Sequence, residues 1–183
     1  GRPVDASYSK PRLSSTVSST SNTTAFGLLP HAVQRGATLA ALTQLRAMGV
    51  TVVFNSNRAA ANAAQTQAAI EAAGLGPARH GETLFLAGDD ATGSKKDGRR
   101  ATIAARYCVV AMGGDQLGDF SDLFNAGQTP AARRAVVQSP AITAKWGAGW
   151  FVLPNPVYGT ALKGSRDEVF PPAIHWAPTQ GIH

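Results

Sequence analysis

The sequence has few residues suited to covalent cross-linking and no stretch suited to a membrane. Of its 183 residues only one is a cysteine, Cys108, so no intrachain disulfide can form. Cys108 lies in an apolar run, and we expect a small buried side chain there rather than a reactive thiol. No apolar stretch is long enough to cross a bilayer, and the chain starts with neither a secretory signal pattern nor a methionine. We therefore expect no transmembrane segment and a chain that has been processed or truncated.

Charged residues are also scarce, at 15% of the chain, whereas apolar residues make up 44%. This balance is typical of one globular domain with its own core. The net charge of +6 favours anionic partners such as phosphates. The simpler interpretation is that scattered lysines and arginines keep the protein soluble. The arginine pairs at 99–100 and 133–134 are too short to form a nucleic-acid-binding face, so we expect no nucleic acid partner.

Short apolar strands alternate with helices through the middle of the chain. We predict helices over residues 30–48, 59–73, 97–106 and 130–137, and strands over residues 50–54, 83–86, 107–112 and 149–153. This alternation specifies parallel strands joined by right-handed crossovers, in an α/β fold with helices on both faces of the sheet.

The two ends of the chain differ from its middle. Residues 1–28 are polar and rich in serine and threonine, and we predict a flexible segment there. Residues 29–163 form the predicted core, in which Trp146 and Trp150 should pack. Residues 164–183 are rich in proline and show no periodicity, which predicts a tail along the surface.

Polar residues follow three of the predicted strands, at the edge where α/β sheets bind ligands. Residues 55–58 (Asn-Ser-Asn-Arg) could hold a phosphoryl oxygen, although ordinary turn chemistry explains them as well. Residues 94–100 contain Lys96, which could neutralise a phosphate; the alternative is a solvated charge run. Asp115 and Asp119 stand four residues apart in a glycine-rich loop and suit Mg²⁺, with an aspartate-capped turn as the alternative.

Taken together, four segments resemble the class B and class C bacterial acid phosphatases, most of all the class C, lipoprotein 5′-nucleotidase branch of the haloacid dehalogenase superfamily. They are residues 52–58, 96–100, 114–120 and 151–159. The similarity runs from about Leu29 to Tyr158. It implies a haloacid dehalogenase-like Rossmannoid three-layer α/β/α fold with a mainly parallel sheet. It also implies Mg²⁺-dependent hydrolysis of phosphate monoesters, with nucleotides as one substrate class, in a periplasmic, secreted or lipoprotein-anchored protein.

The resemblance assigns a role to each of seven residues. The catalytic, substrate-binding and metal-binding positions are, in that order, Ser56 and Lys96; Asn57, Arg58 and Tyr158; and Asp115 and Asp119. Lys95 is the alternative to Lys96 if the alignment shifts by one residue. Gln116 stands where the family usually has asparagine. Residues 1–28 would then be the remnant of a cap segment.

One departure from the family concerns its first motif, a strand that ends in Asp-x-Asp-x-Thr. There the first aspartate is the nucleophile that forms an aspartyl-phosphate, and the second is the general acid and base. No apolar strand of this sequence ends in Asp-x-Asp. Residues 4–8 resemble the stretch directly after that motif in relatives, so we expect the central strand of the sheet to be missing from the chain. Two hypotheses arise: a phosphatase whose first strand comes from elsewhere, for example from another polypeptide, or an inactive binding or structural subunit.

Overall fold

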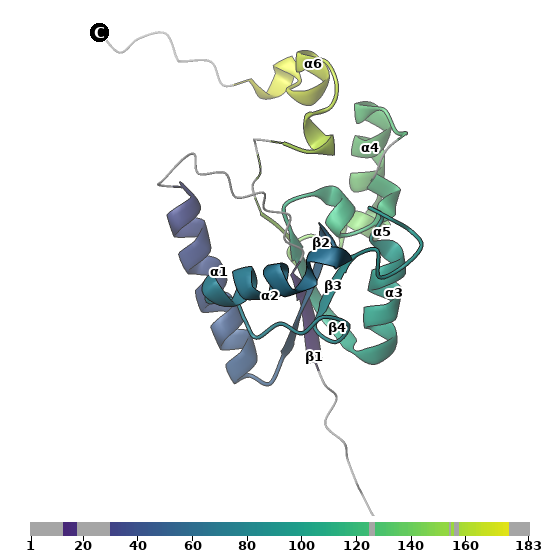
Figure 1. Ribbon diagram of the computed structural model, residues 1–183. Coiled ribbons are helices and arrows are strands. Elements are labelled where there is room, and N and C mark those ends of the chain that lie inside the picture. Colours follow the sequence, from purple (N-terminus) through teal and green to yellow (C-terminus); the bar gives the residue numbers. More distant parts are fainter. Residues whose placement is uncertain (1–12, 18–29, 125–126, 154, 156–157, 176–183) are drawn as a thin grey trace, which may run out of the picture.

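A five-stranded parallel sheet forms the centre of the molecule (Figure 1). The computed structural model describes residues 13–17, 30–124, 127–153, 155 and 158–175. The strands are β1 (Leu13–Val17), β2 (Thr51–Ala59), β3 (Leu84–Ala87), β4 (Cys108–Gly114) and β5 (Trp150–Val152). Their order across the sheet is β3-β2-β1-β4-β5, and every neighbouring pair is parallel.

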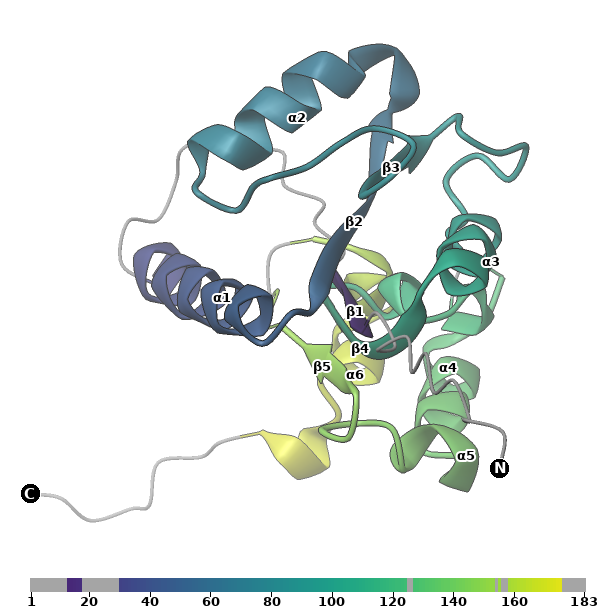
Figure 2. The ribbon, with the colours of Figure 1, turned by 90° about the horizontal axis from the view of Figure 1, so that it is seen from below.

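Helices cover both faces of this sheet. They are α1 (Pro30–Ala47), α2 (Ala63–Ala72), α3 (Asp97–Arg106), α4 (Pro130–Val137), α5 (Pro140–Thr143) and α6 (Arg166–Val169). The first two lie on one face, and α3 lies with α4 on the other, as Figures 1 and 2 show from two directions. The predicted three-layer α/β/α fold is therefore confirmed, and the predicted bounds of α3 and α4 agree with the structure.

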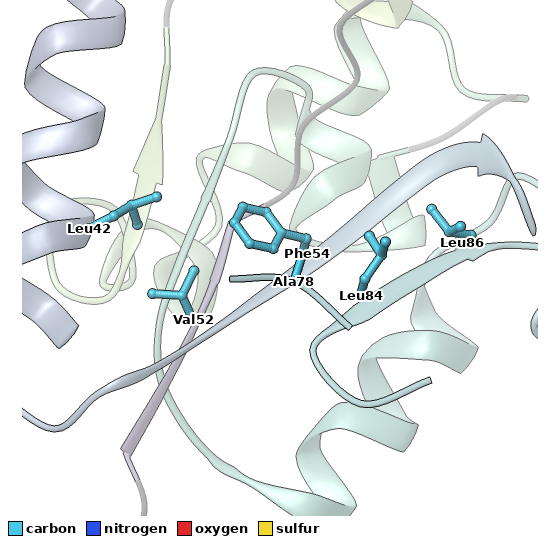
Figure 3. Packing of buried hydrophobic residues seen from close by; sticks show 6 residues of the cluster. All are labelled: Leu42, Val52, Phe54, Ala78, Leu84 and Leu86. Atoms are coloured by element: carbon cyan, nitrogen blue, oxygen red, sulfur yellow. The ribbon is translucent and has the colours of Figure 1, made fainter. Parts of the chain in front are cut away.

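Alternate residues of β2 build the core on the two faces of the sheet. One cluster consists of Leu42, Val52, Phe54, Ala78, Leu84 and Leu86 (Figure 3). Val53 points to the opposite face, where it packs with Phe85 and with Ile103 of α3. Successive side chains of a strand point to opposite faces, so an apolar run such as residues 52–54 suits a strand covered by helices on both sides. Full burial of each such side chain stabilises the fold by about 1.5–3 kcal/mol.

The central place in the sheet is taken by β1, where we expected the strand to be missing from the chain. β1 pairs in parallel with β2, from Ser14 beside Thr51 to Val17 beside Phe54, and with β4 on its other side. Both rows of its backbone groups can find partners there, so a serine- and threonine-rich segment that looks like a loop can be held as a strand. The chain's own residues thus occupy the place for which we expected a strand from elsewhere, for example from another polypeptide. The rest of the predicted flexible segment lies outside the described residues.

β2 continues beyond the apolar run that predicted it. We expected the strand to end at Phe54, but it extends to Ala59. Its register with β3 shifts between Asn55 and Ala59, so residues 56–58 interrupt the regular pairing. Irregularities of this kind re-aim side chains and are common beside functional sites. Local pattern could not predict the extension, because polar residues also favour turns.

Two side-chain predictions have different outcomes. Cys108 is exposed at the start of β4, so the prediction of a buried side chain was wrong. An apolar run predicts a strand, but strand ends reach the edge of the sheet and there meet solvent. Trp146 and Trp150 do pack together, with ring centres 5.2 Å apart, and both contact Phe120. In the predicted tail the chain forms α6 and a short 3₁₀ turn at Pro172–Ile174.

Candidate phosphate site

A pocket of about 220 Å³ lies where β2 and β4 end and α3 begins. Its described lining consists of Asn57, Ser94, Lys96, Gln116, Gly118, Asp119, Tyr158, Gly159 and Thr160. Four of the seven predicted site residues belong to this lining. The other three, Ser56, Arg58 and Asp115, are next to lining residues in the sequence but do not line the pocket themselves. The pocket occupies the edge of the sheet at which the fold class predicts ligand binding.

The polar residues at the end of β2 are held by the protein itself. Ser56 is buried, and its Oγ accepts a hydrogen bond from the backbone N–H of Arg58 at 3.2 Å. The Asn57 amide donates to the carbonyl oxygen of Ser94 at 2.9 Å and accepts from the Arg99 guanidinium at 2.6 Å. Turn chemistry at Ser56 and a bridging amide at Asn57 thus fix the shape of this edge.

Arg99 of α3 is a buried anchor beside the pocket. Its side chain is 1% exposed and donates to the side-chain oxygens of Asn55 and Asn57, at 2.8 and 2.6 Å. It also donates to the carbonyl of Gly93 and lies 3.6 Å from Asp90. Burial lowers the pKa of Arg99 from its ordinary value, and the nearby aspartates oppose that shift. One guanidinium therefore joins β2, α3 and the loop before α3.

Lys96 brings a buried ammonium group to the pocket. The side chain is 3% exposed, and Nζ donates to Asp119 Oδ1 at 2.6 Å and to the backbone carbonyl of Asn55 at 3.1 Å. Desolvation lowers the pKa of Lys96, while Asp119 raises it and Arg99 lowers it further. Lys96 and Arg99 are buried, so these two side chains do not belong to a solvated charge run. The alternative, that residues 94–100 bind phosphate through Lys96, stays a prediction.

The loop after β4 is organised around the Asp119 carboxylate. Its Oδ2 accepts the backbone N–H groups of Asp115 and Gln116, at 3.1 and 3.0 Å. Gly114 lies so close that a Cβ there would stand 2.5 Å from Asp119 Cβ and Oδ2. Any larger residue at this position would push the carboxylate away from Lys96. Glycine is thus required by close approach and not by an unusual backbone angle.

Asp115 faces the C-terminal part of the chain. Its Oδ2 accepts from the hydroxyl of Tyr158 and from the side-chain amide of Asn155, each at 2.9 Å. The neighbouring Gln116 amide donates to the backbone carbonyl of Tyr158 at 3.0 Å. These contacts draw the segment after β5 against the loop after β4, and they close one side of the pocket.

A comparison with known protein families decides how this arrangement is classified. Residues 30–161 match the sequence profile of HAD superfamily, subfamily IIIB (acid phosphatase). The chain belongs to this family. Its members hydrolyse phosphate monoesters, and the predicted resemblance to haloacid dehalogenase-like acid phosphatases is therefore confirmed.

Solved structures of acid phosphatases share the fold of this family member. The class C acid phosphatase from Bacillus anthracis is 21% identical, with a TM-score of 0.62 over 83% of this chain and 70% of that one. A second structure of that enzyme, with tungstate bound, is 20% identical, with a TM-score of 0.62 over 88% of this chain and 78% of that one. No curated protein sequence matches the chain.

Acid phosphatases of this superfamily generally use Mg²⁺, but the described residues do not fit a magnesium site. Both Asp119 oxygens already accept, from Lys96 and from two backbone N–H groups. Asp115 Oδ2 accepts from Asn155 and Tyr158. Among the residues that the structure describes, no three His, Cys, Asp or Glu side chains are grouped to hold a metal. The hydrogen bonds direct Asp119 toward Lys96 and the loop backbone, so the described carboxylates do not converge on one position as Mg²⁺ ligands would.

Sequence reasoning missed residues that support the pocket from neighbouring segments. Asp122 accepts the backbone N–H groups of Lys96 and Asp97, each at 2.9 Å, and so caps the start of α3 from a distant loop. Arg100 donates to the carbonyls of Gly118 and Asp119. No local signal identifies such contacts, because they join residues that are 18 to 26 positions apart in the sequence. Within the described part of the chain, no helix is long and apolar enough to span a membrane.

Proposed function

We propose that the pocket binds the phosphoryl group of a phosphate monoester. The observation that carries this proposal is the buried Lys96 ammonium, which lines the pocket and is held in place by Asp119 and by the carbonyl of Asn55. A fixed cation with little exposure to water attracts an oxyanion more strongly than a solvated lysine does. The neutral polar groups of Asn57 and Thr160 complete a lining suited to phosphate oxygens.

Two further observations support phosphate as the ligand. The chain belongs to a family that hydrolyses phosphate monoesters. A similar solved structure, the class C acid phosphatase from Bacillus anthracis, holds tungstate, which is a tetrahedral oxyanion like phosphate. Nucleotides remain one predicted class of substrate, through the half-exposed ring of Tyr158. An extracytoplasmic location likewise remains a prediction from the family.

Binding without aspartyl-phosphate chemistry is the form of this function that the chain supports best. The central strand β1 reads Leu-Ser-Ser-Thr-Val, and the sequence has no aspartate between Asp5 and Asp89. The family's nucleophile follows the first strand, and here no aspartate can occupy that place. Ser56, Arg58 and Asp115 keep their predicted roles only in the second candidate function, Mg²⁺-dependent hydrolysis with a nucleophile other than an aspartate after β1.

A binding and turnover experiment on the 183-residue chain separates the two candidates. Calorimetric titration with inorganic phosphate should show saturable binding, while p-nitrophenyl phosphate should not be hydrolysed above the buffer rate, with or without Mg²⁺. Binding should disappear when Lys96→Met is combined with Asp119→Asn, which avoids leaving a buried charge unpaired. The matched control is Lys95→Met, because Lys95 is exposed and lies outside the lining.

The possible results exclude different parts of the proposal. No phosphate binding by the unchanged chain would overturn it altogether. Mg²⁺-dependent hydrolysis that Asp115→Asn abolishes would instead establish the enzymatic candidate, with a nucleophile other than an aspartate after β1. Loss of binding in Lys95→Met would show that the wrong lysine had been assigned to the phosphate.

A further inference from the structure

One wall of the pocket consists of residues 158–160, which we call the wall segment. It supplies three of the nine described lining residues. Tyr158 has the largest side chain of that lining and is 44% exposed, so it stands at the rim. Lys96, on α3's side of the lining, is buried. The organic group of a bound ester would extend outward past the rim of the pocket, whereas its phosphoryl group would lie beside the buried cation.

Two side chains hold the wall segment by its backbone carbonyls. Gln116 Nε2 donates to the carbonyl of Tyr158 at 3.0 Å, and Arg133 Nη1 of α4 donates to the carbonyl of Thr160 at 2.7 Å. Between them lies Gly159, with φ of 115°, in a region that side chains disfavour. A Cβ on Gly159 would overlap the Gln116 amide. The wall segment is therefore held on both sides of Gly159, and the glycine permits the close approach of the Gln116 amide.

Arg133 is an unusual residue to find in this position. It is 6% exposed, and among the described residues no carboxylate forms an ion pair with it. Its other contact is with the carbonyl of Gln128 at 3.2 Å, and its Nε is buried with no hydrogen-bond partner in the described chain. Burying a cation without a counter-charge is costly. Burial of the Arg133 cation therefore does not serve the stability of the fold. We attribute it to the contact that Arg133 makes with the pocket wall.

We infer that Arg133, together with Gln116, is a positioning residue that makes the pocket prefer phosphate esters to inorganic phosphate. This inference rests on the proposed function. With Thr160 and Tyr158 fixed by their carbonyls, and with the Tyr158 hydroxyl bonded to Asp115, the Tyr158 ring is held at the rim in one place, and an ester's organic group meets a preformed surface. A loose wall would give the same group fewer contacts and would have to be ordered on binding, which lowers affinity. Inorganic phosphate, which has no organic group, depends on the wall much less.

The test compares two neighbouring arginines of α4. Arg133→Met and Arg134→Met each remove a guanidinium that donates to a backbone carbonyl, but Arg134 contacts Glu168 and not the wall segment. The ligands are inorganic phosphate and phenylphosphonate, whose carbon–phosphorus bond resists hydrolysis. In Arg133→Met the affinity ratio of phenylphosphonate to phosphate should fall about tenfold, which corresponds to roughly one hydrogen bond to a charged group. In Arg134→Met the ratio should stay as in the unchanged chain.

A second variant keeps the inference testable if Arg133→Met fails to fold. Gln116→Asn shortens the amide by one methylene, so it should release the carbonyl of Tyr158 and lower the same ratio. An unaltered ratio in a folded Arg133→Met or Gln116→Asn chain would overturn the inference alone. If the unchanged chain binds no phosphate, the proposed function fails and the inference with it. A purely structural role for Arg133 would lower both affinities together and leave their ratio constant.

Discussion

At the scale of single residues, the buried pair of Lys96 and Asp119 links the fold to the pocket. Their side chains are each 3% exposed, and the charged atoms lie 2.6 Å apart. Such a pair contributes little net stability, because the loss of hydration offsets much of the attraction. Its effect is to fix the ammonium at the pocket and the loop after β4 against α3. Removal of one partner has a different cost, because the other charge stays buried.

The first prediction concerns this asymmetry. Lys96→Met should lower the free energy of unfolding by about 3–5 kcal/mol, because it leaves the Asp119 carboxylate buried and unpaired. Adding Asp119→Asn should recover part of the loss, since an amide carries no charge. Urea denaturation followed by circular dichroism measures both, with Lys95→Met as the exposed control. Equal stability of the single and double variants would contradict the proposed cost of the unpaired charge.

The second prediction uses two adjacent glycines of β4. Gly114→Ala should destabilise the protein by about 1–3 kcal/mol, because the new methyl group would displace the Asp119 carboxylate. Gly113→Ala is the matched control, since a Cβ there has only the carbonyl of Phe151 nearby, at 3.8 Å. Thermal unfolding of the two variants distinguishes them. Similar melting temperatures for both would show that Asp119 can move at little cost.

At the scale of elements, β1 decides whether the sheet is continuous. It lies between β2 and β4, so in a sheet without it these two strands would lose a neighbour each. In a central strand, successive N–H groups donate alternately to the two neighbours. The stability of the whole sheet therefore depends on backbone pairing by five residues with modest apolar content.

This dependence gives the third prediction. Thr16→Pro removes an N–H from the middle of β1, where Thr16 lies beside Val53 and Met112. We expect a loss of about 3 kcal/mol or more in the free energy of unfolding, because proline also clashes in the interior of a sheet. Thr16→Val retains the N–H and a similar shape, and it should differ little from the unchanged chain. If Thr16→Pro is as stable as Thr16→Val in guanidinium denaturation, β1 does not fill the centre.

Elements with a strong local signal could be predicted from the sequence. Pro130 at the start of α4 and the buried apolar run of residues 52–54 in β2 locate these elements correctly. β1 could not be predicted, because its residues favour a loop by composition and become a strand only through two partners that are distant in the sequence. The extension of β2 to Ala59 has the same cause. Pairing, not propensity, determines both.

At the scale of the whole molecule, parallel strands bring distant polar segments to one edge of the sheet. The sequence predicted this convergence for Asn57, Lys96 and Asp119, since each lies in a polar segment after a predicted strand, and the family resemblance added Tyr158. It could not predict that Arg99 would be buried against Asn57, or that Arg133 would reach the pocket wall from α4. Those side chains act across the fold, and adjacent arginines in a sequence look like solvated charge. Only the packing of the folded chain distinguishes the buried Arg99 and Arg133 from the arginines next to them in the sequence.

The most direct test of the central claim locates inorganic phosphate on the folded chain. In a ¹H–¹⁵N spectrum titrated with phosphate, the amide signals of Asn57, Lys96 and Thr160 should shift most and should saturate together. A second pocket, lined by residues that include His80 and Arg106, provides an internal comparison. Shifts confined to the first set would establish the phosphate site at the ends of β2 and β4. Shifts centred on His80 and Arg106, or none at all, would contradict it.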